Sequence, residues 1–215
     1  MKNIVQLLLI ILCSFSNTKA QNVDFDYNKI SKISDSIKVQ NITIHNLFKS
    51  QIIAHKNNEF NSQMIVNNVY LPHKKLWDSC YAQIFGDENA NRFNNKEGMI
   101  KWNQTLFDKN KSEYIERTNA ITKINHNKLF RKNLIKFNRL VPYQPNAKIS
   151  ILFTPITGIG FGGCDAQQFA LELNNKSIDI VYTLEKGLPH ELNHLVYEKF
   201  RNNDIDRNSA LSQTI

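Results

Sequence analysis

The sequence predicts an α+β protein, in which a helical N-terminal lobe precedes a small sheet and a helix rich in functional side chains. Three observations support this. Apolar residues recur at helical spacing from Tyr27 to about Arg139, and residues 168–173 alternate with a period of two. The third is the run His190-Glu191-Leu192-Asn193-His194, which continues as an amphipathic helical pattern. We therefore expect three parts, 1–20, 21–140 and 141–215.

Residues 1–20 have the layout of a cleavable secretory signal peptide. Lys2 gives a basic start, an apolar run covers residues 4–12, and Ala20 ends a short polar stretch. The apolar run is too short to cross a bilayer as a helix. A lipoprotein anchor on Cys13 is the alternative, but Leu12 stands where a small residue is wanted. We expect cleavage after Ala20, a secreted or periplasmic protein and no stable membrane insertion.

The composition argues against a nucleic-acid partner. The formal net charge is +8, and loss of Lys2 and Lys19 with the signal peptide leaves +6. No nucleic-acid-binding motif accompanies this charge, so a solvated helix face is the preferred interpretation of its densest cluster. That cluster consists of Lys128, Arg131, Lys132, Lys136 and Arg139. The oligomeric state is not predicted.

Two cysteines, Cys80 and Cys164, remain after removal of the signal peptide. In an oxidising compartment they can pair and link the helical lobe to the glycine-rich segment. Two free thiols are the alternative. Neither cysteine belongs to a Cys-x-x-Cys pair, so neither a redox dithiol nor a cysteine zinc site is expected.

The predicted helices of the lobe cover residues 27–37, 77–84, 96–108 and 112–138, the last broken near 125–127. The histidines here are interpreted as surface or packing residues: His45, His55, His73 and His126.

The predicted sheet follows a break at residues 141–145. Residues 148–154 read as one strand and 168–173 as a half-buried strand with Phe169, Leu171 and Leu173 on its inner face. A turn at 174–176 then leads to a third strand, 177–182. Pro189 suits the first turn of the next helix, although the helix can also begin at 183–186 and be distorted by Gly187 and Pro189.

The motif after Pro189 has the residue types that hydrolytic zinc chemistry requires. On a helix, His190 and His194 project from one face, one turn apart, and can share one metal ion. Glu191 lies on the neighbouring strip, where it can act as general base towards a water that the metal activates. The alternative without a metal is a surface helix that carries two unrelated histidines.

The run His190-Glu191-Leu192-Asn193-His194, with apolar residues around it, resembles the zincin metallopeptidases, and most closely bacterial secreted zinc peptidases of the gluzincin type. The resemblance covers about the last quarter of the chain. It implies Zn²⁺ as cofactor, His190 and His194 as metal ligands, Glu191 as catalytic base and a peptide or protein as substrate. Residues 141–215 are then expected to be a partial zincin-like catalytic region.

The chain departs from the gluzincin pattern at the third ligand. A gluzincin spacing places that ligand near Gln213 or Thr214, neither of which binds zinc, and the sequence stops at Ile215. The expectation is a chain truncated just before its third ligand. Asp204 and Asp206 are weak candidates, and Glu198 lies too far along the helix from His190. The metzincin extension also fails, because Tyr197 and Phe200 replace its Gly and His.

Two other functions are weighed against the peptidase. Gly158–Gly163 satisfies the G-x-G-x-x-G spacing of dinucleotide sites, but the residues that follow alternate like a strand and do not start a helix. A glycine-rich hairpin near the cleft is therefore preferred. The other alternative is an inactive relic, or an exported basic helical binding protein, that lacks a complete metal site.

Overall fold

The computed structural model describes residues 24–82, 84–85, 93–156, 158, 160–162 and 167–204, without the side chains of 79 and 198–204. Its strands are β1 (Ser36–Val39), β2 (Ile42–Asn46), β3 (Ala147–Leu152), β4 (Gly160–Gly162) and β5 (Gln168–Glu172). Its α-helices are α2 (Tyr27–Ser31), α3 (Leu47–Ile53), α4 (Ser62–Ile65), α6 (Lys96–Gln104), α7 (Lys111–Thr122), α8 (His126–Leu140), α9 (Ile180–Tyr182) and α10 (Leu188–Asp204). Short 3₁₀ and π turns are η1 (Lys56–Asn58), η2 (Val66–Tyr70), η3 (Leu71–His73), η4 (Leu76–Tyr81) and η5 (Thr183–Gly187).

The five strands form one mixed sheet in the order β1-β2-β3-β5-β4. Its centre is parallel, since β2 pairs with β3 and β3 pairs with β5 in that sense. Both edges are antiparallel: β1 pairs with β2, and β4 pairs with β5. The long connection from β2 to β3 contains the helices α3 to α8, as a parallel pair requires. The protein is therefore a mixed α+β structure.

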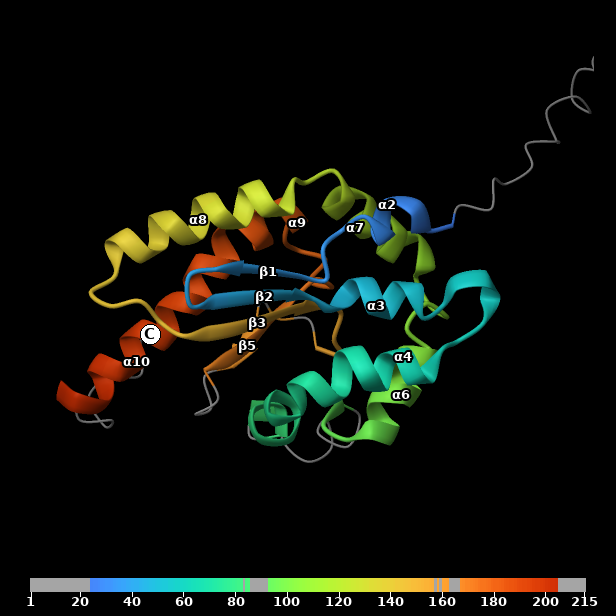
Figure 1. Cartoon of the computed structure of the whole chain (residues 1–215). Helices are drawn as coiled ribbons and strands as arrows, with labels where there is room; N and C mark the ends of the chain where they lie inside the picture. Colours follow the sequence, from blue (N-terminus) through green and yellow to red (C-terminus); the bar gives the residue numbers. More distant parts are fainter. Residues whose placement is uncertain are drawn as a thin grey trace, which may run out of the picture.

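Helices cover both faces of this sheet. In Figure 1, α8 lies on one side of the strands and α4 and α6 lie on the other. The first core cluster includes Ile149 of β3, Leu134 of α8 and Leu192 of α10. The second includes Leu152 of β3 and Trp77 of η4. Neighbouring residues of β3 thus pack into different cores, because successive side chains of a strand point to opposite faces.

The N-terminal prediction of one helix over 27–37 is wrong beyond Ser31. Helix α2 ends there, and Ile37 lies in β1. Residues 36–46 form a hairpin in which Ile37 faces Ile44 across the strands. The apolar residues Ile37, Val39, Ile42 and Ile44 all enter the first core. Strand β2 of the expected helical lobe pairs with β3, so the sheet joins residues 21–140 to the region that follows them.

The other predicted helices of the lobe are present: η4 (Leu76–Tyr81) lies in the region predicted over 77–84, α6 is shorter than predicted, and α7 and α8 extend slightly beyond 112–138. Residues 96–104 form α6, and the break expected near 125–127 separates α7 from α8. At that break the Asn125 side chain accepts a hydrogen bond from the N–H of Lys128. Asn95, Asn61 and Asp26 cap α6, α4 and α2 in the same way. Three asparagines therefore serve as N-caps, which satisfy backbone N–H groups that a helix leaves free.

Two predictions about the sheet need correction. Residues 177–182 do not form a strand; after a turn, Ile180–Tyr182 begin a helix that Asp179 caps. Strand β5 is present, but both of its faces are buried, and Ala170 and Glu172 are as inaccessible as Leu171. The physical reason is that β5 lies between β3 and β4 and has protein on both faces. Its polar residues are therefore buried as well as its apolar ones.

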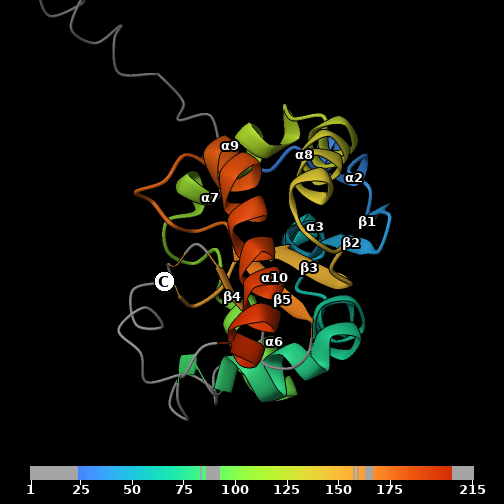
Figure 2. The same ribbon diagram turned by 90° about the vertical axis from the view of Figure 1, so that its left-hand side faces the viewer.

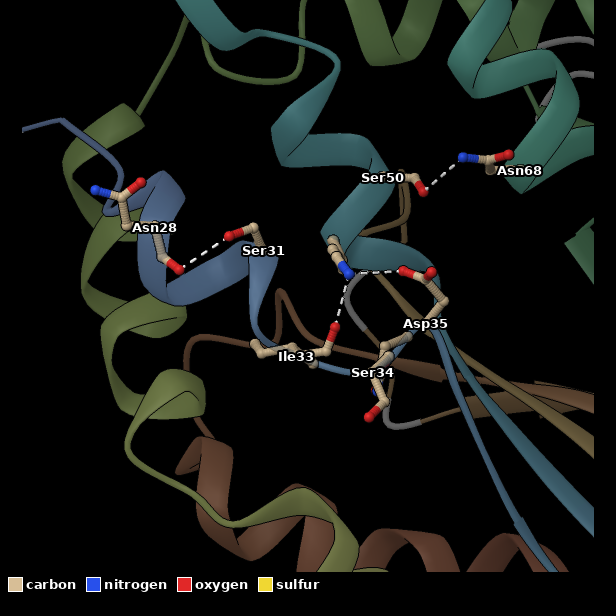
Figure 3. A network of polar contacts seen from close by, with 9 residues as sticks. Asn28, Ser31, Ile33, Ser34, Asp35, Ser50 and Asn68 are labelled. Atoms are coloured by element: carbon tan, nitrogen blue, oxygen red, sulfur yellow. Dashed lines mark hydrogen bonds and ion pairs between the residues drawn. The ribbon is translucent and has the colours of Figure 1, made fainter.

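The loop between α2 and β1 is tied to α3 by polar contacts (Figure 3). The Lys49 ammonium of α3 lies 2.8 Å from the Asp35 carboxylate and donates to the Ile33 carbonyl at 2.7 Å. The two Lys49 contacts hold the loop before β1 against α3. At the next residue of α3, the Ser50 hydroxyl accepts from Asn68 of η2 at 3.1 Å, which ties η2 to the same helix.

Several predictions concern residues or properties that the fold leaves open. The signal peptide, its cleavage after Ala20 and the alternative at Cys13 lie outside the described residues. The five cations of α8 are exposed, and none makes an ion pair within the described part of the chain. In the ranges that the structure describes, no helix is both long and apolar enough to span a membrane.

Candidate functional site

The H-E-x-x-H motif lies in the first two turns of α10. The helical path begins earlier, at α9, where the Asp179 carboxylate accepts the N–H of Tyr182 at 2.9 Å. It continues through the π turn η5 into α10 without leaving helical geometry. Pro189 has no N–H to donate to the preceding turn, and a wider turn directly before it accommodates that loss. The helical path thus begins at Ile180, before the earlier predicted start at residues 183–186, and its π turn over 183–187 lies where a distortion was expected.

Helix α10 is oriented by its apolar side. Leu188, Leu192 and Val196 are buried in the first core. Near the last of these buried residues, the Tyr143 hydroxyl donates to the carbonyl groups of Leu195 and Val196, both at 3.1 Å. In Figure 2 the helix runs in front of the sheet, in the same part of the view as β4 and β5. The buried leucine stripe fixes which side chains of the motif face outward and which face the sheet.

His190 and His194 point to the same place. Their Nε2 atoms are 3.2 Å apart, and the ring centroids are 4.8 Å apart with the rings nearly perpendicular. His190 is exposed and His194 is partly exposed. Two Zn–N bonds at a tetrahedral angle place their nitrogen atoms about 3.3 Å apart. In the structure the two Nε2 atoms share a hydrogen bond, and their separation is close to the distance between two zinc-bound nitrogen atoms.

Glu191 turns away from solvent towards the edge of the sheet. A Cβ atom at Gly160 of β4 would lie 2.9 Å from the Glu191 carboxyl carbon, so the carboxyl group rests on a residue without a side chain. Burial raises the pKa of Glu191, and the neighbouring His190 partly offsets this. The carboxyl group is thus placed between the histidine pair and strand β4.

A second carboxyl group, that of Glu172 at the end of β5, lies near that of Glu191. It is fully buried, and its Oε1 contacts the Thr154 hydroxyl. Burial raises its pKa to about 7; the contacts with Thr154 and Gly158 oppose this shift, and the charge of Glu191 adds to it. The sequence interpretation missed Glu172 because it placed this residue on the solvent face of a half-buried strand. The nearby Gly158 and Gly160 were the available signal that two side chains approach the backbone here.

Gly158 and Gly160 each contact one carboxyl group in the space that a side chain would fill. A Cβ at Gly158 would lie 2.5 Å from Glu172 Oε2, just as one at Gly160 would meet Glu191. Residues 160–162 form the antiparallel edge strand β4. In a dinucleotide site the glycine-rich segment leads directly into a helix. Here it leads into an edge strand, which supports the predicted glycine-rich hairpin and not a dinucleotide site. Residues 157, 159 and 163–166 lie outside the described ranges.

The third metal ligand expected from the resemblance is not placed. Glu198 and Asp204 lie in α10, but their side chains are not described, and Asp206, Gln213 and Thr214 lie outside the described residues. Within the described residues, no group of three His, Cys, Asp or Glu side chains is arranged to hold a metal ion. The described donor set is therefore the histidine pair alone.

A hollow adjoins the histidine pair at the N-terminal end of α10. Its volume is about 340 Å³, and it is lined by Ile178, Tyr182, Thr183, Lys186, Gly187 and His190. Positions 183, 186, 187 and 190 follow the spacing of one helix face, so the hollow runs along the helix and ends at an imidazole.

The remaining histidines have packing partners. The ring of His73 is buried, contacts the Ser150 hydroxyl at 3.2 Å and lies against His45. His55 bonds to the Asn103 carbonyl, and His126 to the Ile121 carbonyl. Burial lowers the pKa of all four, that of His73 to about 3. These four side chains therefore have packing and hydrogen-bonding partners, as a packing role predicts.

Cys80 is buried in the second core and is disulfide-bonded. The partner predicted from the sequence, Cys164, lies outside the described residues.

No family model, curated protein or solved structure matches this chain.

Proposed function

We propose that the protein is a secreted zinc-dependent metallopeptidase of zincin-like type, with His190 and His194 as zinc ligands and Glu191 as catalytic base. The observation that carries this proposal is the 3.2 Å separation of the two Nε2 atoms on one face of α10, with Glu191 on the adjoining strip. Neutral imidazole is the commonest protein ligand of zinc, and the observed spacing fits a tetrahedral site.

The zinc ion would supply a Lewis acid that polarises the scissile carbonyl group and acidifies a water molecule. Glu191 accepts the proton of the attacking water and returns it to the leaving amine. Its partly buried position raises its pKa and so favours both halves of this proton transfer. The hollow beside His190, which Lys186 also lines, provides room for a substrate residue at one end of the site.

The edge of the sheet supports a peptide as the substrate. Strand β4 pairs with β5 on one side, and in the strand order it ends the sheet on the other. An extended peptide can add to such an edge through backbone hydrogen bonds. Gly160, the first residue of β4, lies against Glu191, so a peptide on this edge would pass close to the proposed base.

A non-catalytic protein is the second candidate. It is favoured by the absence, among the residues described, of a third ligand near the histidine pair. Two imidazoles bind zinc weakly and activate water poorly, and such a protein would be an inactive relic or an exported binding protein.

Metal analysis combined with a Glu191 variant separates the two. The purified chain should contain zinc close to one per molecule and should hydrolyse peptides from a mixed-sequence library. Glu191→Gln should keep the zinc and lose at least a hundred-fold in rate, on the order expected for a lost general base. The matched control is Glu185→Gln, an equal charge change at an exposed site of the same helical path. Full activity in Glu191→Gln, or no zinc in the wild type, would contradict the proposal.

A further inference from the structure

The carboxyl group of Glu172 lies beside that of Glu191, and within the described residues only Glu191 has a cation, His190, acting on it. Glu172 is fully buried, and among the described charged groups only Glu191, from α10, acts on it. The elements around Glu172 contribute the Thr154 hydroxyl and the backbone of Gly158. Its Oε2 has no hydrogen-bond partner of good geometry in the described part of the chain. An ionised carboxylate in such a place is strongly unfavourable unless it is paired.

The hydrogen bonds of Thr154 give an independent indication. Its hydroxyl oxygen lies 2.8 Å from the Ile156 carbonyl oxygen, and it accepts the Ile156 N–H at 3.2 Å. A carbonyl oxygen can only accept, so this contact uses the single hydroxyl proton. With that proton used, the contact between the hydroxyl and Glu172 Oε1 is a hydrogen bond only if the carboxyl group supplies the proton. If Thr154 donated to Glu172 instead, a buried anion beside a second carboxyl group would be left with only the Thr154 hydroxyl and the Gly158 backbone as described partners.

We propose that Glu172 is a neutral carboxylic acid in the folded protein and that it donates its proton to Thr154, so that it places no negative charge beside Glu191. Glu172 is a positioning residue, because it acts on the proposed base and does not touch the reacting atoms. Were Glu172 ionised, its charge would oppose ionisation of Glu191. This role towards Glu191 rests on the proposed function, whereas the protonation of Glu172 does not.

The pH dependence of unfolding tests the protonation directly. A carboxyl group with a higher pKa in the folded than in the unfolded chain stabilises the fold at low pH, and this stabilisation is lost as the pH rises towards the folded value. For Glu172 the two values are the ordinary 4.5 and about 7. Glu172→Gln keeps a donor for Thr154 but has no such proton to lose. Between pH 4.5 and 7, the unfolding constant of the wild type should rise relative to that of Glu172→Gln by on the order of a hundred-fold.

Infrared spectroscopy gives a second readout, independent of stability and of activity. The wild type at pH 6 should show the carbonyl band of a buried protonated carboxyl group. This band should disappear in Glu172→Gln, persist in Glu191→Gln and shift in Thr154→Val, which removes the acceptor. The exposed Glu59 supplies the control Glu59→Gln, which should change neither the band nor the pH profile.

The outcomes separate this inference from the proposed function. Parallel pH profiles of wild type and Glu172→Gln, or a band that survives in that variant, would overturn it. If Glu172→Gln does not fold, an unshifted band in Thr154→Val overturns it equally. A protein that passes these tests but binds no zinc and cleaves no peptide has the neutral Glu172 and lacks the proposed activity.

Discussion

The residue that most directly controls the position of Glu191 is a glycine. A Cβ at Gly160 would lie 2.7 Å from the Ala170 carbonyl oxygen as well as 2.9 Å from the Glu191 carboxyl carbon. The first of these neighbours is backbone of the adjacent strand and cannot move without disturbing the sheet. Gly160 therefore allows β4, β5 and α10 to meet at one point, beside the proposed base.

We predict that Gly160→Ala weakens both stability and activity. The added methyl group must push β4 away from β5 or displace Glu191, and overpacking of this kind costs about 1–3 kcal/mol. Urea unfolding measures the loss, and peptide hydrolysis should fall at least ten-fold. The control is Gly98→Ala in α6, where alanine favours the helix. Equal activity of Gly160→Ala and wild type would show that Glu191 does not depend on this contact.

Of the candidate site residues, the sequence could identify those on one helix but not those brought in by the sheet. His190, Glu191 and His194 are four positions apart at most, so helical spacing alone relates them. Glu172 is separated from Glu191 by a strand end, a turn and two helical turns. Its burial depends on the layers that cover β5, which no local pattern contains.

At the scale of the element, the helical path from α9 to α10 sets the direction of the motif. Asp179 caps its beginning: the side chain accepts from Tyr182, and the carbonyl group accepts from Thr183 at 2.9 Å. The path then includes a π turn and Pro189, both of which weaken regular helical bonding. The cap at Asp179 therefore stabilises a helical path whose next turns have fewer regular backbone hydrogen bonds.

We predict that Asp179→Ala destabilises the protein by about 1 kcal/mol, the usual cost of a lost N-cap. Asp179→Asn keeps an accepting oxygen at the same place and should retain nearly all of the stability. The measurement is the midpoint of urea unfolding at constant slope. If the asparagine variant loses as much as the alanine variant, the carboxylate charge and not the cap is what stabilises α9.

The elements themselves were predicted unevenly, for a physical reason. Helices α6, α7 and α8 carry apolar stripes and Asn caps within their own sequences. The hairpin β1–β2 was missed because Tyr27, Ile30, Ile33 and Ile37 also fit a helical period. The alternation of Ile37, Val39, Ile42 and Ile44 becomes decisive only when β3 offers a partner.

For the whole molecule, the sheet is what joins the first and second halves of the chain. Strand β2 reaches β3 across about a hundred residues, and the first core contains residues from Phe25 to Val196. The second core lies on the other face and contains Cys80 among Trp77, Tyr81 and Phe93. A disulfide at Cys80 thus cross-links the helical connection near its middle.

We predict that Cys80→Ser lowers the free energy of unfolding by about 2–4 kcal/mol, because the unfolded chain loses a cross-link. Cys164→Ser should cause the same loss, and the double variant should lose no more than either single one. Thermal unfolding with and without a reductant measures this, and a reductant should affect only the wild type. A Cys164→Ser protein that still responds to the reductant would contradict the predicted pairing.

The sequence by itself determined the α+β class, most helices after residue 96, the strands β3 and β5, and the spacing of His190, Glu191 and His194 on one helix. Each of these depends on residues within one or two turns of each other, so periodicity and capping carry the information. Only the tertiary structure decided that residues 36–46 complete the sheet, that residues 180–182 are helical and that Glu172 is buried beside Glu191. These features depend on which distant segment covers a face, and that depends on the free energy of packing over the whole chain.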